Sequence, residues 1–143
     1  MKKVLVLNGP NLNLLGSREP GIYGDLSLEQ IAHRLEKLAR ELDVVLDIRQ
    51  SNSEAELLGW LQQTDGFSAV VINPAALTHY SIGLRDVISV VRDRGIRVVE
   101  CHLSNPAARE VFRHESLISG VSNGVVAGFG AESYALALRA AVS

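Results

Sequence analysis

Apolar residues along the chain are grouped into short runs that alternate with longer stretches of helical spacing. Some runs are continuously apolar and end at turn-forming residues, as in Asn73-Pro74, which is typical of buried strands. One run alternates apolar side chains with Asp47 and Arg49, which is typical of a strand at a sheet edge. Five strands are therefore expected, at about residues 3–8, 44–50, 69–73, 97–101 and 123–128.

The stretches between these runs predict amphipathic helices. Ser27 with Gln30, and Ser53 with Glu56, have the spacing of capping boxes, in which the first residue caps a helix and the fourth residue caps in return. Asn105-Pro106 places proline at a first helical position. Helices are expected to follow Ser27, Ser53 and Ser81, to run from Asn105-Pro106 to about Phe112, and to run from about Glu132 to Val142.

Strands and helices thus alternate five times, and no repeat or linker interrupts them. Such alternation predicts an α/β fold with a parallel sheet that is covered by helices on both faces. With five strands, the expected architecture is the flavodoxin-like one, with strand order 2-1-3-4-5. We expect residues 1–143 to form a single domain.

Composition excludes several classes of protein. The chain has 143 residues, of which 47% are hydrophobic and 21% charged, so it is too apolar for a disordered protein. Its net charge of -2 argues against a nucleic-acid partner, and no apolar run approaches the roughly 20 residues of a membrane span. The apolar run after Lys3 is too short for a signal peptide. The lone Cys101 fits a reducing compartment, so a cytoplasmic location is expected.

Ligands of such sheets bind beyond the carboxyl ends of the strands, which directs attention to the loops there. Two of the four histidines, His79 and His102, fall in these loops, and histidine titrates in the range that acid–base catalysis needs. Glu100 would share a face with His102, either to orient its imidazole or in a salt bridge at the strand end. The loops and the following helix contain Asn8, Asn11, Asn13, Arg18, Tyr23, Asn73, His79, His102, Ser104, Asn105, Arg109 and Arg113.

The arginines near this edge predict a small anionic substrate. Arg18, Arg109 and Arg113 suit a carboxylate or a phosphate, although Arg109 in particular would also be ordinary on a solvated helix face. If residues 105–112 are helical, the spacing of Arg109 and Arg113 puts both on one side. Tyr23 lies in the long loop 9–26, where a tyrosine is usually an anchor but becomes a candidate base beside an arginine.

Other site chemistries lack their motifs. The chain has no GxGxxG after the first strand, no GxxxxGK[ST] and no GxSxG at a turn from a strand into a helix, which argues against nucleotide loops and a serine nucleophile elbow. His, Cys, Asp and Glu residues do not recur at metal-ligand spacing. We therefore expect neither a metal nor a cofactor.

Three blocks of sequence resemble type II 3-dehydroquinate dehydratase, a family of dodecameric enzymes. The first block runs from Asn8 to Gly16 and continues through Arg18 and Tyr23-Gly24. The second comprises Ile72–Ala76, Thr78-His79 and Leu84–Asp86, and the third Glu100, His102–Asn105, Arg109-Glu110, Phe112–His114 and Ser116. Leu77 and Cys101 depart from the residues that are common in the family, at positions without an assigned role.

The resemblance implies the dehydration of 3-dehydroquinate to 3-dehydroshikimate by anti elimination through an enolate. Tyr23 would be the base beside Arg18, Asn11 would hold a water that stabilises the enolate, and His102, supported by Glu100, would be the acid. The substrate carboxylate would bind Asn73 and the backbone of Leu103 and Ser104, and the ring hydroxyls would bind His79 and Arg113. Arg109 has a supporting role at most, and Asp86 would reach a neighbouring subunit's site within a trimer of the dodecamer.

The alternative is a flavodoxin-like module that binds a small anion without catalysis. The lysines bear on the mechanism of the enzyme, because the unrelated type I dehydroquinases form an imine through a lysine. Here only Lys2, Lys3 and Lys37 are available among 14 basic residues. The predicted fold places the first two at the wrong sheet edge and the third on a polar helix face. The resemblance therefore implies the shikimate-pathway reaction without a Schiff base.

Overall fold

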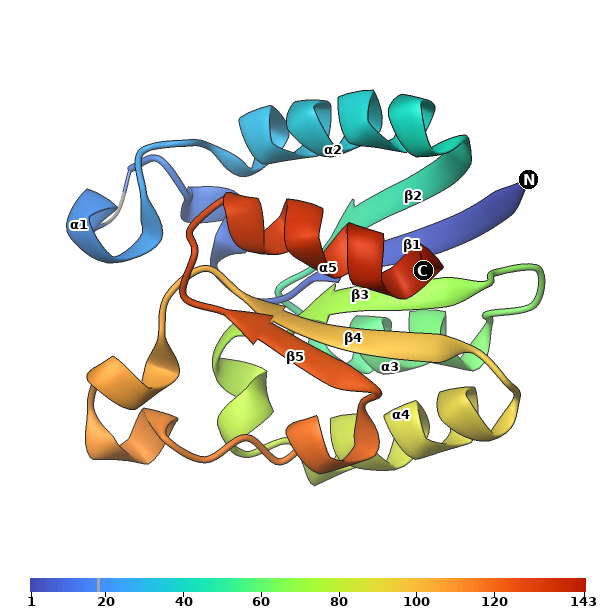
Figure 1. Cartoon of the computed structure of the whole chain (residues 1–143). Helices are drawn as coiled ribbons and strands as arrows, with labels where there is room; N and C mark the ends of the chain where they lie inside the picture. Colours follow the sequence, from blue (N-terminus) through green and yellow to red (C-terminus); the bar gives the residue numbers. More distant parts are fainter. Residues whose placement is uncertain (18) are drawn as a thin grey trace.

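Five parallel strands form one sheet in the computed structural model, which describes residues 1–17 and 19–143. The strand order is β2-β1-β3-β4-β5, as predicted. All five arrows in Figure 1 point toward the same edge, which the loops after the strands occupy. The strands are β1 (Lys2–Asn8), β2 (Val44–Gln50), β3 (Ala69–Asn73), β4 (Arg97–His102) and β5 (Gly124–Ala127).

Four longer helices cover the sheet on both faces. On one face lie α2 (Leu28–Leu42) and α5 (Glu132–Val142), and on the other lie α3 (Glu54–Gln62) and α4 (Ile82–Asp93). The predicted flavodoxin-like α/β arrangement is confirmed. None of the helices in the described part of the chain combines the length and the apolar composition that crossing a bilayer requires.

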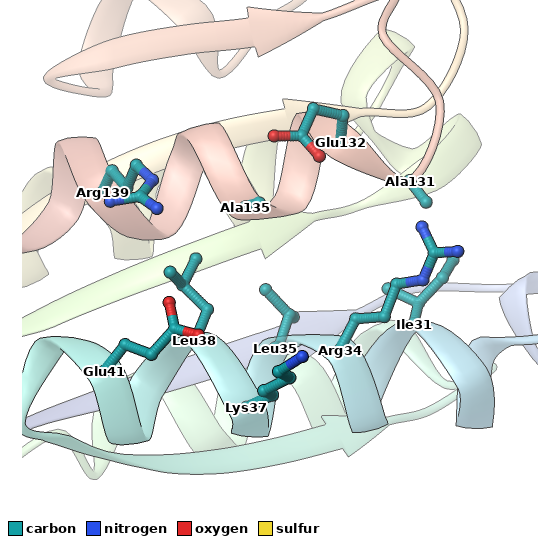
Figure 2. Close-up of a pocket in the computed structure, with 10 residues that line it drawn as sticks. All are labelled: Ile31, Arg34, Leu35, Lys37, Leu38, Glu41, Ala131, Glu132, Ala135 and Arg139. Carbon is teal, nitrogen blue, oxygen red and sulfur yellow. The ribbon is translucent and has the colours of Figure 1, made fainter.

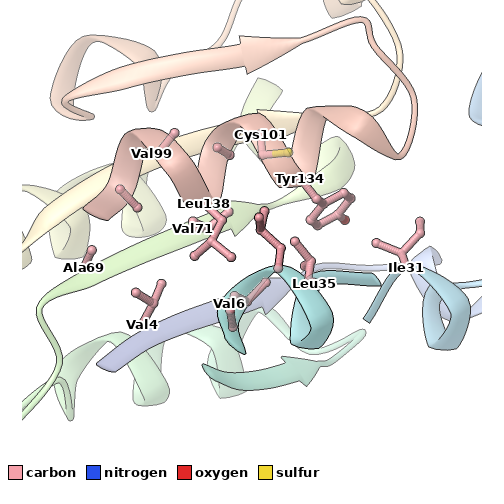
Figure 3. Close-up of a cluster of buried hydrophobic side chains, with 14 of the residues drawn as sticks. Val4, Val6, Ile31, Leu35, Ala69, Val71, Val99, Cys101, Tyr134 and Leu138 are labelled. Atoms are coloured by element: carbon pink, nitrogen blue, oxygen red, sulfur yellow. The ribbon is translucent and has the colours of Figure 1, made fainter. Parts of the chain in front are cut away.

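Alternating side chains of the central strands build two separate cores. Val4 and Val6 of β1 pack with α2 and α5, in the cluster drawn in Figure 3. Leu5 and Leu7 point the other way, toward α3 and α4. Because both faces are covered, every residue of β3 is buried, which explains why its sequence reads as a continuous apolar run. The same alternation decides which face each polar residue at a strand end occupies.

Helix caps agree with the sequence prediction in all but one detail. Ser27 and Gln30 form the complete capping box before α2. Ser53 Oγ accepts from the Glu56 N–H, but in the described residues the reciprocal bond from the Glu56 side chain is not formed, so this box is half complete. Ser81 caps α4 through the Leu84 N–H. These caps fix where the helices begin relative to the sheet edge.

The predicted helix between Asn105 and Phe112 is wrong. Two short 3-10 turns take its place, η3 (Pro106–Ala108) and η4 (Val111–Arg113). Between them, Arg109 has an extended backbone (φ -112°, ψ -162°), which interrupts helical hydrogen bonding. The prediction that Arg109 and Arg113 share one helical face is therefore wrong as well. Within loop 9–26, η1 (Leu12–Leu14) and α1 (Pro20–Tyr23) are present, and η2 (Ala75–His79) and η5 (Ser119–Val121) are further short turns.

Gly9 joins the loops that follow β1 and β3. Its N–H donates to the Asn73 carbonyl at 2.8 Å, and a Cβ at this position would lie 2.6 Å from the Pro74 carbonyl oxygen. That approach is closer than a carbon and a backbone oxygen tolerate, so only glycine lets the two loops meet here.

We predict that Gly9→Ala lowers the free energy of unfolding by about 1–3 kcal/mol, because the new methyl group forces the loops apart. Gly59→Ala is the matched control, since a Cβ at this α3 position meets nothing within 4 Å. It should raise stability by about 0.5–1 kcal/mol through helix propensity. Urea titrations of both variants measure the difference, and equal stability of Gly9→Ala and the unmodified chain would contradict the close approach.

Candidate active site

A polar pocket of about 130 Å³ opens at the carboxyl edge of the sheet. Its walls come from the loops after β1, β3 and β4, which the parallel strand order brings together. It is lined by Pro10, Asn11, Leu12, Tyr23, Asn73, Ala75, Ala76, His79, His102, Leu103, Ser104, Pro106, Arg109 and Arg113.

Nine of the residues that the sequence singled out line this pocket, namely Asn11, Tyr23, Asn73, His79, His102, Leu103, Ser104, Arg109 and Arg113. Glu100 lies behind His102 and is buried. Asp86 is exposed on α4 and does not line the pocket of its own chain. Arg18 lies outside the described residues, so its predicted place beside Tyr23 stays a prediction. The pocket therefore brings together residues that are up to 102 positions apart in the sequence, from Asn11 to Arg113.

His102 and Glu100 form a buried pair at the end of β4. His102 Nε2 lies 2.5 Å from Glu100 Oε2, and Glu100 is 1% exposed. Burial raises the pKa of Glu100, but hydrogen bonds from His102, Ser119 and Ser116 outweigh it and hold this pKa below its usual value. The carboxylate is therefore ionised at neutral pH and faces the imidazole. This geometry favours an orienting role for Glu100 over a salt bridge at the surface.

Tyr23 and Arg109 form a second polar pair in the same pocket. One guanidinium nitrogen of Arg109 donates to Tyr23 Oη at 2.7 Å, and the guanidinium carbon lies 5.0 Å from the ring centroid. Another guanidinium nitrogen contacts Ser104 Oγ at 3.3 Å. The extended backbone of Arg109 is what sends its side chain across to α1. This contact places a positively charged donor directly beside the tyrosine oxygen.

Asn73 is held by a buried tyrosine that sequence reasoning missed. Its Nδ2 donates to Tyr134 Oη at 2.9 Å, and Tyr134 Oη donates to Asn8 Oδ1 at 2.7 Å. Asn73 Oδ1 accepts from the Ala75 N–H at 3.1 Å, so the amide orientation is fixed from both ends. Tyr134 is 1% exposed on the inner face of α5. A tyrosine on a core-facing helix position is the signal that could have found it, because its hydroxyl needs a partner.

The remaining polar side chains of the pocket are also held in place. His79 Nδ1 lies 2.8 Å from the Glu115 carbonyl oxygen, which leaves Nε2 for a ligand. Arg113 Nε donates to Glu110 Oε2 at 3.1 Å. A backbone hydrogen bond and the Arg113 side chain lower the pKa of Glu110. Arg109 and Arg113 together give the pocket two fixed cations, which suit an anionic ligand.

The described part of the chain offers neither a lysine nor a metal cluster to this pocket. Lys2 Nζ donates to the Val142 carbonyl, and Lys3 lies 4.7 Å from the Phe67 ring centroid, both at the amino ends of the strands. Lys37 lines a separate depression between α2 and α5, shown in Figure 2. No group of three His, Cys, Asp or Glu side chains among the described residues is arranged to hold a metal ion.

Fold and pocket together define a doubly wound α/β protein equipped for acid–base chemistry on a small anion. A family model described as "Dehydroquinase class II" matches residues 2–142. The chain therefore belongs to the class II dehydroquinase family, as the resemblance implied.

Known relatives agree with this assignment. A protein named 3-dehydroquinate dehydratase from Brucella canis is 52% identical over 140 residues, which cover 97% of this chain and 87% of the relative. The crystal structure of type II dehydroquinase from Butyrivibrio crossotus has a TM-score of 0.96 at 38% identity, and the match covers 99% of this chain and 98% of the other. That of type II dehydroquinase from Propionibacterium acnes has a TM-score of 0.93 at 44% identity, with 100% and 98% covered.

We predict that Tyr134→Phe lowers the free energy of unfolding by about 1–3 kcal/mol, because Asn8 and Asn73 each lose a buried partner. Tyr80→Phe is the matched control, since Tyr80 is 62% exposed and its change should stay within about 0.5 kcal/mol. Equal urea midpoints for the two variants would show that the Tyr134 hydroxyl does not hold the two amides.

Proposed function

We propose that the chain catalyses the dehydration of 3-dehydroquinate to 3-dehydroshikimate and water by anti elimination through an enolate. Family membership and the names of the relatives support the reaction. The observation that carries the mechanism is the presence of two separate polar pairs, Tyr23–Arg109 and His102–Glu100, in one pocket. Elimination requires a base for one bond and an acid for the other, and the two pairs supply them.

Tyr23 is the base that removes a proton from C2 of the substrate. The C2–H electrons form the enolate, and the proton passes to the phenolate oxygen of Tyr23. The Arg109 guanidinium, 2.7 Å from this oxygen, stabilises the phenolate before the step. Arg109 therefore takes a larger part than the supporting role that the sequence suggested, beside the predicted contribution of Arg18. Tyr23 lies on α1, in the long loop after β1. Closure of this loop over the substrate therefore completes the site.

The enolate is stabilised by a water that Asn11 holds. Asn11 has a left-handed backbone (φ 70°), which asparagine tolerates better than most residues do. Its N–H donates to Asn52 Oδ1 at 3.0 Å, which anchors the residue while its side chain lines the pocket. A preorganised donor at the developing oxyanion lowers the barrier to proton abstraction.

His102 is the acid that protonates the departing C1 hydroxyl. The C1–O bond breaks as the enolate electrons move to form the C=C bond, and the proton of His102 converts the hydroxide into water. Glu100 stabilises the imidazolium form that must be present before the step. Because Nε2 is engaged with Glu100, Nδ1 is the ring nitrogen that acts on the substrate.

Substrate binding uses the remaining polar groups of the pocket. Asn73 and the backbone of Leu103 and Ser104 bind the carboxylate, while His79 and Arg113 bind ring hydroxyls. Tyr134 supports Asn73 by fixing its amide.

Asp86 serves a neighbouring subunit, which is compatible with its exposed position on α4, away from its own pocket. The assembly is a dodecamer built from trimers, and it acts in the cytoplasmic shikimate pathway, as the family resemblance implies.

The reaction is tested by the ultraviolet absorbance of the conjugated enone after 3-dehydroquinate is added. We predict that Tyr23→Phe retains folding and substrate binding but loses at least about 100-fold in kcat, because no phenolate remains to take the proton. Tyr80→Phe, which alters an exposed tyrosine outside the pocket, should keep normal turnover. Near-normal turnover of Tyr23→Phe would remove Tyr23 as the base, and absence of turnover in the unmodified protein would favour the anion-binding module.

A second experiment addresses the covalent route. Because none of the described residues that line the pocket is a lysine, sodium borohydride added together with 3-dehydroquinate should leave activity unchanged and add no mass to the chain. Intact-protein mass spectrometry and residual activity measure both outcomes. A stable adduct of substrate mass on Lys2, Lys3 or Lys37 would contradict the enolate mechanism without an imine.

A further inference from the structure

The Glu100 carboxylate is contacted by three hydroxyl groups in addition to His102. They belong to Thr78, Ser116 and Ser119, and none of these side chains lines the pocket. We infer that Ser119, together with Thr78 and Ser116, is a positioning residue that keeps Glu100 charged and directed at Nε2 of His102. This inference rests on the proposed acid role of His102. The three hydroxyls are called the hydroxyl cradle below.

Donors approach both oxygens of the carboxylate. Oε2 accepts from Thr78 Oγ1 at 3.0 Å and from Ser116 Oγ at 2.9 Å, besides its contact with His102. Oε1 accepts from Ser119 Oγ, and Ser116 Oγ lies 3.2 Å from it. A carboxylate has about four lone-pair sites, so the hydroxyl cradle and the imidazole fill its hydrogen-bonding capacity. The carboxyl group has no freedom to rotate away from His102 without losing a bond.

The hydroxyl cradle is itself held rigidly. Ser116 Oγ accepts from the N–H groups of Ile118 and Ser119, at 3.3 and 3.2 Å, and lies 2.7 Å from Thr78 Oγ1, so the two hydroxyls contact each other as well as Glu100. The Thr78 carbonyl accepts from the Leu117 N–H at 2.8 Å, so η2 is tied to residues 116–119. Arg85 of α4 donates to the Leu117 carbonyl at 2.7 Å. The donors are therefore preorganised rather than gathered by the substrate.

The buried charge of Glu100 requires hydrogen-bond donors such as those of the hydroxyl cradle. A buried carboxylate normally takes up a proton unless a cation or several donors compensate for the lost water. Among the described residues, no lysine or arginine forms an ion pair with Glu100, and the titratable group that faces it is His102. The thiol of the neighbouring Cys101 lies in the opposite core, and burial and the charge of Glu100 raise its pKa. The hydrogen bond and charge of His102 lower the pKa of Glu100 most, and the hydroxyl dipoles of Ser119 and Ser116 lower it further.

This arrangement has a consequence for the acid step. Hydroxyl groups do not titrate near neutral pH, so they favour the carboxylate over the carboxylic acid without competing for the proton of His102. If Glu100 became protonated, the imidazolium form of His102 that the proposed acid step uses would lose its counter-charge. Weakening the hydroxyl cradle should therefore lower kcat at acidic pH and leave substrate binding nearly intact.

The test uses Ser119→Ala and Thr78→Val, each of which removes one donor to Glu100. On the acidic limb of the pH profile, we expect kcat to fall by up to roughly tenfold with KM changed less than about twofold, since one hydrogen bond to a charged group is lost. The acidic limb of the kcat profile should move up by about one pH unit, because the pKa of Glu100 rises. Ser119→Thr keeps the hydroxyl and should restore the normal profile.

Ser122→Ala is the matched control. Ser122 lies in the same segment, is buried, and donates to the Ile118 carbonyl at 2.9 Å rather than to Glu100. It should lower stability without moving the pH profile. A purely structural role of the hydroxyl cradle would instead make Ser119→Ala and Thr78→Val resemble Ser122→Ala, with an unshifted acidic limb, and would overturn the inference.

A readout without turnover separates the inference from the proposed function. Infrared difference spectra across a pH titration follow the carboxylic-acid band of Glu100, which Glu100→Gln identifies by its loss. The band should appear at higher pH in Ser119→Ala and Thr78→Val than in the unmodified chain and Ser122→Ala. If the band titrates at the same pH in all four proteins, the inferred role of the hydroxyl cradle is overturned even if dehydration is observed. If the titrations shift but the unmodified protein is inactive, only the proposed function is overturned.

Discussion

Buried polar groups at the carboxyl ends of β1, β3 and β4 require hydrogen-bond partners inside the protein. The positions of these partners determine how the helices and loops are joined to the sheet around the pocket. Asn8 and Asn73 stand opposite each other in the parallel register of β1 and β3. Neither side chain reaches water, so both amides require internal partners. Tyr134 of α5 supplies them, which joins a helix at the end of the chain to its first strand. Satisfying these groups fixes the polar floor of the pocket.

Parity along β4 separates catalytic groups from the core. Glu100 and His102 face the α3/α4 side, and Cys101 between them packs with α2 and α5. A register shift of one residue would place Cys101 where the carboxylate stands and turn the pair toward the core under α2 and α5, away from the hydroxyls of Thr78, Ser116 and Ser119. Two features therefore specify the register of β4. One is the alternation of its apolar side chains, and the other is that the hydrogen-bond partners of Glu100 lie on one face of the sheet.

Most of the fold follows from local patterns that act over a few residues. Apolar runs, caps such as Ser27 with Gln30, and the βα alternation predict the strand order and the sheet edge at which the pocket lies. Nine pocket residues follow from that placement and from the family resemblance. The extended backbone at Arg109 does not follow, because helix signals around Asn105-Pro106 compete with a long-range bond to Tyr23. At this position the hydrogen bond between Arg109 and Tyr23, which are 86 residues apart, outweighs the local helix propensity.

The partners of buried groups are the other part that the sequence does not reveal. Serine and threonine occur on many surfaces, so nothing local distinguishes Ser119, which contacts Glu100, from Ser122, which caps a turn. Their difference arises only when the loop after β4 folds back on η2 and aims one hydroxyl at the carboxylate. The same holds for Tyr134, whose helical position indicates burial but not a partner 61 residues away. The side chains that line the pocket can be predicted from strand ends, whereas the groups that hydrogen-bond to them depend on tertiary contacts between distant segments.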